Sequence, residues 1–95
     1  MADVSRRVVV GSRVGLHARP AKLVAQEAGR QRVVVKIGKN GRDLVDARSL
    51  LSLLALGAKK GEEVTLSADG EGAQAAVDAI ASLVEQDLDE EPADA

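Results

Sequence analysis

The chain has 95 residues, enough for one domain with a modest hydrophobic core. It contains no Cys, Phe, Tyr or Trp, which excludes disulfides, cysteine-ligated metals and aromatic stacking of nucleic-acid bases. No apolar run approaches the roughly 20 residues that cross a bilayer, and the N-terminus lacks the apolar segment of a signal peptide. We therefore expect a cytoplasmic protein that neither enters membranes nor binds nucleic acid. The net charge of −2 is uneven, because residues 85–95 hold six of the 15 acids and leave residues 1–84 mildly basic. The basic charge of residues 1–84 favours binding of an anion or of an acidic partner protein.

The first half of the chain predicts a strand, a helix and a hairpin. The β-branched run Arg6–Val10 is typical of a strand. Apolar residues recur at helical spacing over Ala18–Ala28, and Gly29 is expected to end this helix in the left-handed conformation. The run Arg32–Ile37 predicts a second strand, and Asn40-Gly41 predicts a tight hairpin into a third strand at 43–46.

The second half predicts a short helix, a strand and a long helix. Ser49 is a plausible N-cap for a helix that runs to Leu56 and is stopped by Gly57. Strict alternation over Glu63–Ala68 predicts a half-buried strand. An apolar stripe predicts the last helix over Glu71–Glu85.

The predicted order is therefore β-α-β-β-α-β-α in a single domain over residues 1–86. One sheet and amphipathic helices indicate an α+β fold of two layers, in which the helices cover one face of the sheet. The acidic residues 87–95 lie beyond the last helix and are expected to form a disordered tail.

The segment GLHARPA, Gly15–Ala21, holds the only histidine at the start of the first predicted helix. A helix N-terminus presents unpaired N–H groups and partial positive charge, so it attracts anions and disfavours an imidazolium. A neutral imidazole at His17 keeps a lone pair that can act as a nucleophile. A phosphoryl group placed there would meet the helix N–H groups and the guanidinium of Arg19. Pro20 lacks an N–H, but the first turn of a helix does not need one.

Other roles for His17 are a plain surface position or a helix cap. A metal site is not supported, because a structural zinc is bound by four cysteine or histidine ligands and the chain has one histidine and no cysteine. A serine nucleophile of the Gly-x-Ser-x-Gly type is not supported either, because that motif is absent.

Two segments resemble the HPr family, the histidine-containing phosphocarriers of the bacterial phosphoenolpyruvate–sugar phosphotransferase system. They are GLHARPA and DARSLLSLLALGAKKGEEVTL, Asp46–Leu66, and the resemblance extends over about residues 4–85. It implies an open-faced sandwich, with a four-stranded antiparallel sheet and three helices on one face. It also implies that His17 takes a phosphoryl group on Nδ1 from phospho-enzyme I and gives it to a sugar-specific enzyme IIA.

The resemblance further implies a role for the residues after His17. Arg19 would hold the phosphoryl oxygens, and the backbone N–H groups of Ala18 and Arg19 would complete a phosphate cradle. The protein would be a stoichiometric carrier rather than an enzyme, a monomer that needs neither cofactor nor metal. Two alternatives stay open. One is a related protein that uses the same chemistry in a regulatory phosphorelay, and the other is a binding module of this fold that transfers nothing.

A docking surface is expected on the helix that begins near Ser49. Five leucines crowd this short helix, and helical geometry spreads them over more than one face. The resemblance implies that Leu53 packs inward and that an exposed apolar patch is formed by Leu50, Leu51 and Leu54. Steering of acidic partners is expected from Arg13, Lys22 and Arg48. A fully buried helix is the alternative.

Ser49 has two candidate roles. Its position suits a helix N-cap, which needs no further function. In Gram-positive members of the family the matching serine is phosphorylated by a kinase, so the resemblance makes Ser49 a candidate regulatory site with a serine kinase and phosphatase as partners. A phosphate there would place negative charge beside the leucine patch and hinder an acidic partner.

Overall fold

The computed structural model describes residues 3–12, 15–39 and 43–86. In chain order its elements are β1 (Asp3–Val9), α1 (Ala18–Gly29), β2 (Lys36–Lys39), β3 (Val45–Asp46), α2 (Leu50–Leu56), β4 (Glu63–Asp69) and α3 (Ala73–Glu85). The expected Asn40-Gly41 hairpin, Arg13 and the acidic tail lie outside the described residues. The observed order of elements is the predicted one.

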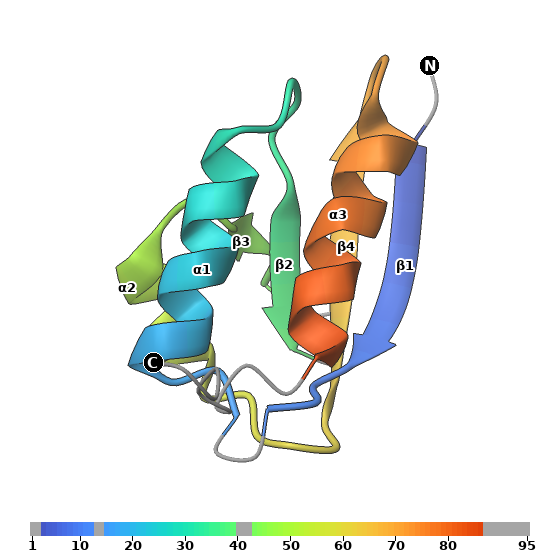
Figure 1. Cartoon of the computed structure of the whole chain (residues 1–95). Helices are drawn as coiled ribbons and strands as arrows, with labels where there is room; N and C mark the ends of the chain where they lie inside the picture. Colours follow the sequence, from blue (N-terminus) through green and yellow to red (C-terminus); the bar gives the residue numbers. More distant parts are fainter. Residues whose placement is uncertain (1–2, 13–14, 40–42, 87–95) are drawn as a thin grey trace, which may run out of the picture.

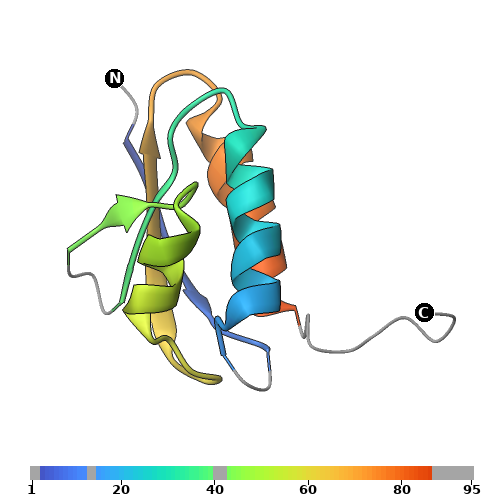
Figure 2. The ribbon, with the colours of Figure 1, turned by 90° about the vertical axis from the view of Figure 1, so that its left-hand side faces the viewer.

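The four strands form one sheet in the order β1-β4-β2-β3, with every neighbouring pair antiparallel. All three helices lie on the same face of this sheet, as the two perpendicular views show (Figures 1 and 2). The fold is therefore the expected α+β open-faced sandwich. Among the described residues, no helix is long and apolar enough to cross a membrane.

The core lies between the helices and the sheet. Along β4, Val64, Leu66 and Ala68 are buried, while the residues between them face the open side of the sheet. Each large aliphatic side chain buried in this way stabilises the fold by roughly 1.5–3 kcal/mol. The largest fully buried apolar side chains come from both layers and include Val24, Ile37, Leu53, Leu66 and Ile80.

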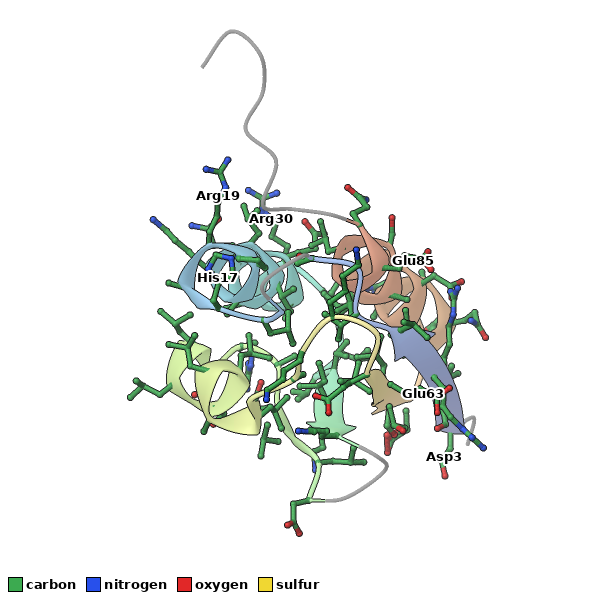
Figure 3. All side chains as sticks on the ribbon, turned by 90° about the horizontal axis from the view of Figure 1, so that it is seen from below. Asp3, His17, Arg19, Arg30, Glu63 and Glu85 are labelled. Carbon is green, nitrogen blue, oxygen red and sulfur yellow. The ribbon has the colours of Figure 1, made fainter. Side chains whose placement is uncertain are left out.

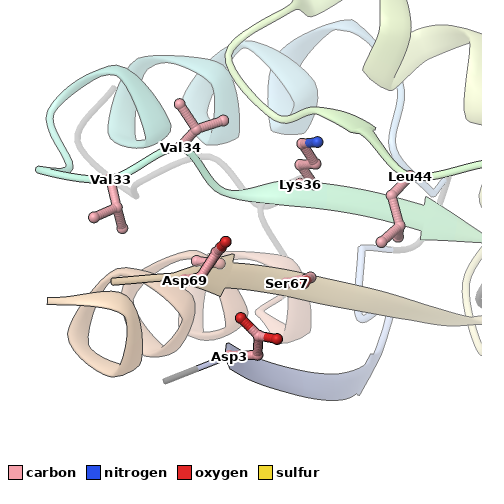
Figure 4. Close-up of a pocket in the computed structure, with 8 residues that line it drawn as sticks. Asp3, Val33, Val34, Lys36, Leu44, Ser67 and Asp69 are labelled. Atoms are coloured by element: carbon pink, nitrogen blue, oxygen red, sulfur yellow. The ribbon is translucent and has the colours of Figure 1, made fainter. Parts of the chain in front are cut away.

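Three strands start at residues other than those predicted, and β3 begins at Val45 rather than at residue 43. Strand β1 starts at Asp3 rather than Arg6, because it pairs along the whole of β4 and reaches the Asp3–Asp69 pair. Strand β2 starts at Lys36 rather than Arg32. The chain at Val33 and Val34 diverges from the end of β4 and leaves an open depression on the sheet (Figure 4). In the valine run before β2, Val35 is fully buried, Val33 is half-buried and Val34 is exposed.

The expected left-handed cap at Gly29 is wrong. Gly29 lies inside α1, and the C-cap residue Arg30 is right-handed with φ −90°. The N–H of Arg30 reaches back to Glu27 and Ala28, and the N–H of Gln31 bonds to the Ala28 oxygen at 3.2 Å. These bonds satisfy the last carbonyls, so no left-handed residue is needed there. At the end of α2, by contrast, the C-cap residue is Gly57, which was predicted to stop this helix and has a positive φ of 62°.

The end of β1, the end of α3 and the start of α1 meet at one end of the molecule. The N–H of Gly11 bonds to the carbonyl oxygen of Val84 at 3.0 Å, and the Ser12 hydroxyl donates to the carbonyl of Gln86 at 3.3 Å. These contacts fix the strand end against the last turn of α3. The view onto this end shows α1 and α3 side by side, with the labelled His17 on α1 (Figure 3).

Candidate functional site

His17 is the N-cap residue of α1. Its backbone is extended (φ −91°, ψ −168°), and its carbonyl accepts the first helical hydrogen bond from Ala21 at 2.9 Å. Its side chain makes no capping hydrogen bond, so the imidazole does not serve the helix as a side-chain cap. The residue is half-buried, which leaves part of the ring accessible to a partner.

The first turn of α1 after His17 is suited to an anion. Ala18 and Arg19 are exposed, and first-turn N–H groups have no carbonyl one turn earlier within the helix. The buried Pro20, third in the helix, has no N–H to leave unpaired. No acidic residue lies in this turn to satisfy the positive end of the helix dipole. The helix start therefore favours binding of negative charge next to the imidazole.

Arg19 and His17 come from the same end of α1. Figure 3 shows the Arg19 side chain extending outward, with its guanidinium directed away from the imidazole. Arg19 is exposed, and its long side chain has several rotamers available in solvent.

The loop before His17 is held against the segment that follows α2. Gly15 has φ +82°, and a Cβ atom on it would overlap the carbonyl oxygen of Ala58. The N–H of Leu16 donates to that same oxygen at 2.9 Å, and the Leu16 side chain is buried. Close approach of the two backbones thus positions His17 relative to α2.

An open depression of about 370 Å³ lies beside His17. Its walls come from the start of α1 and from the end of α2 with the loop beyond it. The lining residues are Leu16, His17, Ala18, Leu54, Gly57, Ala58 and Lys59. None of these described residues is acidic, so the depression does not repel an anion. Sequence reasoning did not single out Lys59, because it depended on the fold to bring residues 15–17 and 57–59 together.

The predicted leucine patch is exposed next to this depression. Leu51 is 79% exposed, Leu50 38% and Leu54 37%, whereas Leu53 is fully buried. The alternative of a fully buried helix is wrong. Because Leu54 also lines the depression, the patch and the histidine lie on one continuous surface. That arrangement allows one partner to cover both.

The basic residues expected to steer partners have different surroundings. Lys22 is exposed on α1. Arg48 is held by Asp46, with Nη2–Oδ2 and Nε–Oδ1 distances of 2.7 and 3.0 Å. The side-chain hydrogen bond from Arg48 is the main cause of the lowered pKa of Asp46, and the same bond raises the pKa of Arg48. Arg13 lies outside the described residues.

Ser49 is the N-cap of α2, as expected. Its Oγ accepts a hydrogen bond from the N–H of Ser52 at 3.2 Å, and the residue is half-buried. The capping role is therefore confirmed.

The depression on the open face of the sheet has different chemistry. It encloses about 580 Å³ and is lined by two carboxylates, Asp3 and Asp69, with Lys36 and apolar side chains (Figure 4). Opposed carboxylates disfavour a phosphoryl group there. Among the described residues, no three His, Cys, Asp or Glu side chains gather where they could hold a metal ion.

The family described as "PTS HPr component phosphorylation site" matches residues 4–86. The chain belongs to the HPr family. It is 47% identical to the phosphocarrier protein HPr of Streptomyces coelicolor, over 92% of this chain and 94% of that protein. This is the HPr phosphocarrier family of the bacterial phosphotransferase system, and an HPr is a carrier rather than a catalyst.

Two solved HPr-family structures are similar in fold. An HPr from Bacillus anthracis superimposes with a TM-score of 0.81 at 37% identity, covering 88% of this chain and 99% of that one. Crh of Bacillus subtilis, a catabolite-repression protein, superimposes with a TM-score of 0.69 at 40% identity, covering 90% and 97%. That Crh structure is a domain-swapped dimer, so the expected monomer stays a prediction for this chain.

Proposed function

We propose that this chain carries a phosphoryl group on Nδ1 of His17 from phospho-enzyme I to a sugar-specific enzyme IIA in the cytoplasm. The observation that carries the proposal is the placement of the one histidine of the sequence as the N-cap residue of α1, next to the first-turn N–H groups of the helix. An N-cap position supports this proposal, because the N–H groups of a helix start favour negative charge nearby. Family membership supports the same chemistry.

In the accepting step, the lone pair of the His17 imidazole forms a bond to phosphorus. The bond between phosphorus and the donor breaks, and the donor leaves with that electron pair. In the donating step, the bond from His17 to phosphorus breaks and the imidazole recovers its electrons. Phosphoryl transfer depends on positioning and on stabilising charge on the oxygens, which the residues after His17 supply.

The first-turn N–H groups of Ala18 and Arg19 form the backbone cradle in this proposal, and the Arg19 guanidinium closes over the phosphoryl oxygens. The helix end contributes roughly 0.3–1 kcal/mol for an exposed anion, and up to about 2 kcal/mol in favourable geometry. Arg19 adds charge-assisted hydrogen bonds. An open site suits this role, because donor and acceptor proteins must reach the same histidine in turn.

The leucine patch of Leu50, Leu51 and Leu54 provides the shared docking surface, with Lys22 and Arg48 at its basic margin. Exposed apolar side chains on a small domain mark an interaction site when they are contiguous. Phosphorylation of Ser49, at the start of the same helix, would place charge beside this patch and weaken docking.

The relay itself is the test. Labelled phosphoenolpyruvate and enzyme I are combined with an enzyme IIA, with or without this chain. We expect label on enzyme IIA only when the chain is present, and none when His17→Ala replaces it. A chain that binds both proteins but moves no label would be a binding module of this fold.

A further inference from the structure

The wall of the depression opposite His17 carries Lys59, on the loop that follows α2. We propose that the Lys59 ammonium group binds the phosphoryl group carried on His17, from the side opposite α1. This proposal rests on the phosphocarrier function and adds a second cation to that site. Arg19 then holds the phosphoryl oxygens from the helix, and Lys59 holds them from across the depression.

The backbone of Lys59 is fixed next to the loop that carries His17. A Cβ atom on Gly15 would lie 2.8 Å from the Lys59 Cα, so the two chain segments are in direct contact there. The N–H of Leu16 bonds to the carbonyl of Ala58, the residue before Lys59, at 2.9 Å. The backbone of Lys59 therefore has a defined place beside Gly15, which precedes His17 by two residues.

A second set of bonds holds Lys59 from its other side. Its N–H donates to Oε1 of Glu62 at 2.8 Å, and its carbonyl accepts the N–H of Glu62 at 3.0 Å. Gly61 in the same turn donates to the carbonyl of Val10 at 2.9 Å. The turn is thus closed on itself and tied to the chain after β1. The side chain of Lys59 is exposed.

The ammonium group of Lys59 is available for an anion. The nearby carboxylate of Glu62 is engaged by the Lys59 N–H and by Nζ of Lys39 at 3.2 Å. Within residues 3–12, 15–39 and 43–86, no carboxylate forms an ion pair with Lys59. Lysine binds phosphate as a point charge on a flexible stem, which suits a group that arrives and leaves in each cycle.

Lys60 offers a matched control. It is exposed and carries the same charge one residue further on, but it does not line the depression. Replacing either lysine by glutamine changes the net charge equally. Long-range steering of an acidic partner is therefore altered to a similar extent in both variants, and only a local contact with the phosphoryl group distinguishes them.

The first measurement uses no partner protein. The wild type, Lys59→Gln, Lys59→Arg and Lys60→Gln are phosphorylated on histidine with phosphoramidate, and the phosphoryl group is titrated by phosphorus NMR. A nearby cation favours the dianion, so loss of Lys59 should move the titration midpoint up by about 0.2–0.7 pH units. Lys59→Arg should stay near the wild type and Lys60→Gln should match it.

The second measurement is the equilibrium of phosphoryl exchange with enzyme I. The phosphorylated fraction of each variant gives the equilibrium constant for phosphoryl transfer from phospho-enzyme I to the chain. We expect this exchange constant to be about two- to fivefold lower for Lys59→Gln than for Lys60→Gln. Equal midpoints and equal exchange constants for the two glutamine variants would overturn the role of Lys59 while leaving the carrier function intact. A wild type that takes no phosphoryl group from either donor would overturn both.

Discussion

Gly15 and Ala58 touch through their backbones, and this contact sets the histidine loop against the end of α2. Gly15 has φ +82°, and a Cβ atom there would overlap the Ala58 carbonyl oxygen. A left-handed conformation costs a non-glycine residue about 1–2 kcal/mol, and the overlap adds to it. Gly57, with φ +62°, has nothing within 4 Å of its virtual Cβ.

Gly15→Ala should therefore destabilise the protein more than Gly57→Ala. We expect Gly57→Ala to lower the melting temperature by about 4–8 °C, which corresponds to about 1 kcal/mol, and Gly15→Ala to lower it at least twice as far. Thermal unfolding by circular dichroism measures both. Equal losses would mean that the contact with Ala58 is not tight.

Arg19→Lys keeps the charge at the phosphoryl site but loses the planar fork of the guanidinium. We expect transfer from phospho-enzyme I to slow by about tenfold, which is about 1.4 kcal/mol in the barrier, with little change in melting temperature. Arg30→Lys, at the other end of α1, serves as the control and should transfer at the normal rate. Unchanged transfer rates for Arg19→Lys would show that the Arg19 guanidinium does not hold the phosphoryl oxygens during transfer.

Leu51→Asp should separate docking from folding. Leu51 is 79% exposed, so the free protein should lose no more than about 0.5 kcal/mol of stability. Binding to enzyme I or enzyme IIA should weaken much more, because the carboxylate would have to be desolvated in the interface. Leu53→Ala gives the opposite pattern, a loss of about 2–5 kcal/mol in stability from the core. A large drop in melting temperature for Leu51→Asp would mean that Leu51 belongs to the core and that the docking surface does not include it.

Two substitutions of Ser49 test its cap and its proposed regulation. Ser49→Ala removes the oxygen that accepts the Ser52 N–H and should cost about 1 kcal/mol. Ser49→Asp keeps a capping oxygen and suits the helix dipole, so the fold should be unharmed. Calorimetric titration should nevertheless show weaker partner binding for Ser49→Asp than for Ser49→Ala. If the two variants bind equally well, charge at this position does not regulate docking.

The turn that holds Lys59 should weaken in acid. The pKa of Glu62 is lowered by the hydrogen bond from the Lys59 N–H and by its bond with Lys39. A carboxyl with a lowered folded-state pKa stabilises the fold above its unfolded value, near 4.3, and this contribution is lost as the pH falls through the folded value. At pH 7 the wild type should have a higher melting temperature than Glu62→Gln, and this difference in melting temperature should vanish near pH 2. A difference independent of pH would contradict this.

Local patterns predicted the elements well, and tertiary pairing decided their limits. The alternation over β4 was enough to assign which side chains of that strand are buried. Sequence patterning could not show that β1 extends to Asp3, because residues 3–5 become part of the strand through pairing with residues 67–69 of β4. Likewise, the valine run before Lys36 has strand composition, but it diverges from β4.

Prediction of the site divided in the same way. His17 stood out because a lone histidine before a proline-containing helix start is a local pattern. Helical spacing predicted only that the leucines of α2 lie on more than one face, and the resemblance to the HPr family implied which of them are exposed. Lys59 could not be found in this way. It approaches the histidine only through the contact of Gly15 with Ala58 and Lys59, a relationship between segments more than 40 residues apart.

Acceptance of a phosphoryl group by His17 is the central claim, and a single labelling measurement tests it most directly. The wild type and His17→Ala are incubated with labelled phosphoenolpyruvate and enzyme I, and the attached label is tested for stability in acid and in base. We expect one acid-labile, base-stable phosphoryl group on the wild type and none on His17→Ala, with both proteins melting at similar temperatures. Label of that kind on a folded His17→Ala variant, or none on the wild type, would contradict the account.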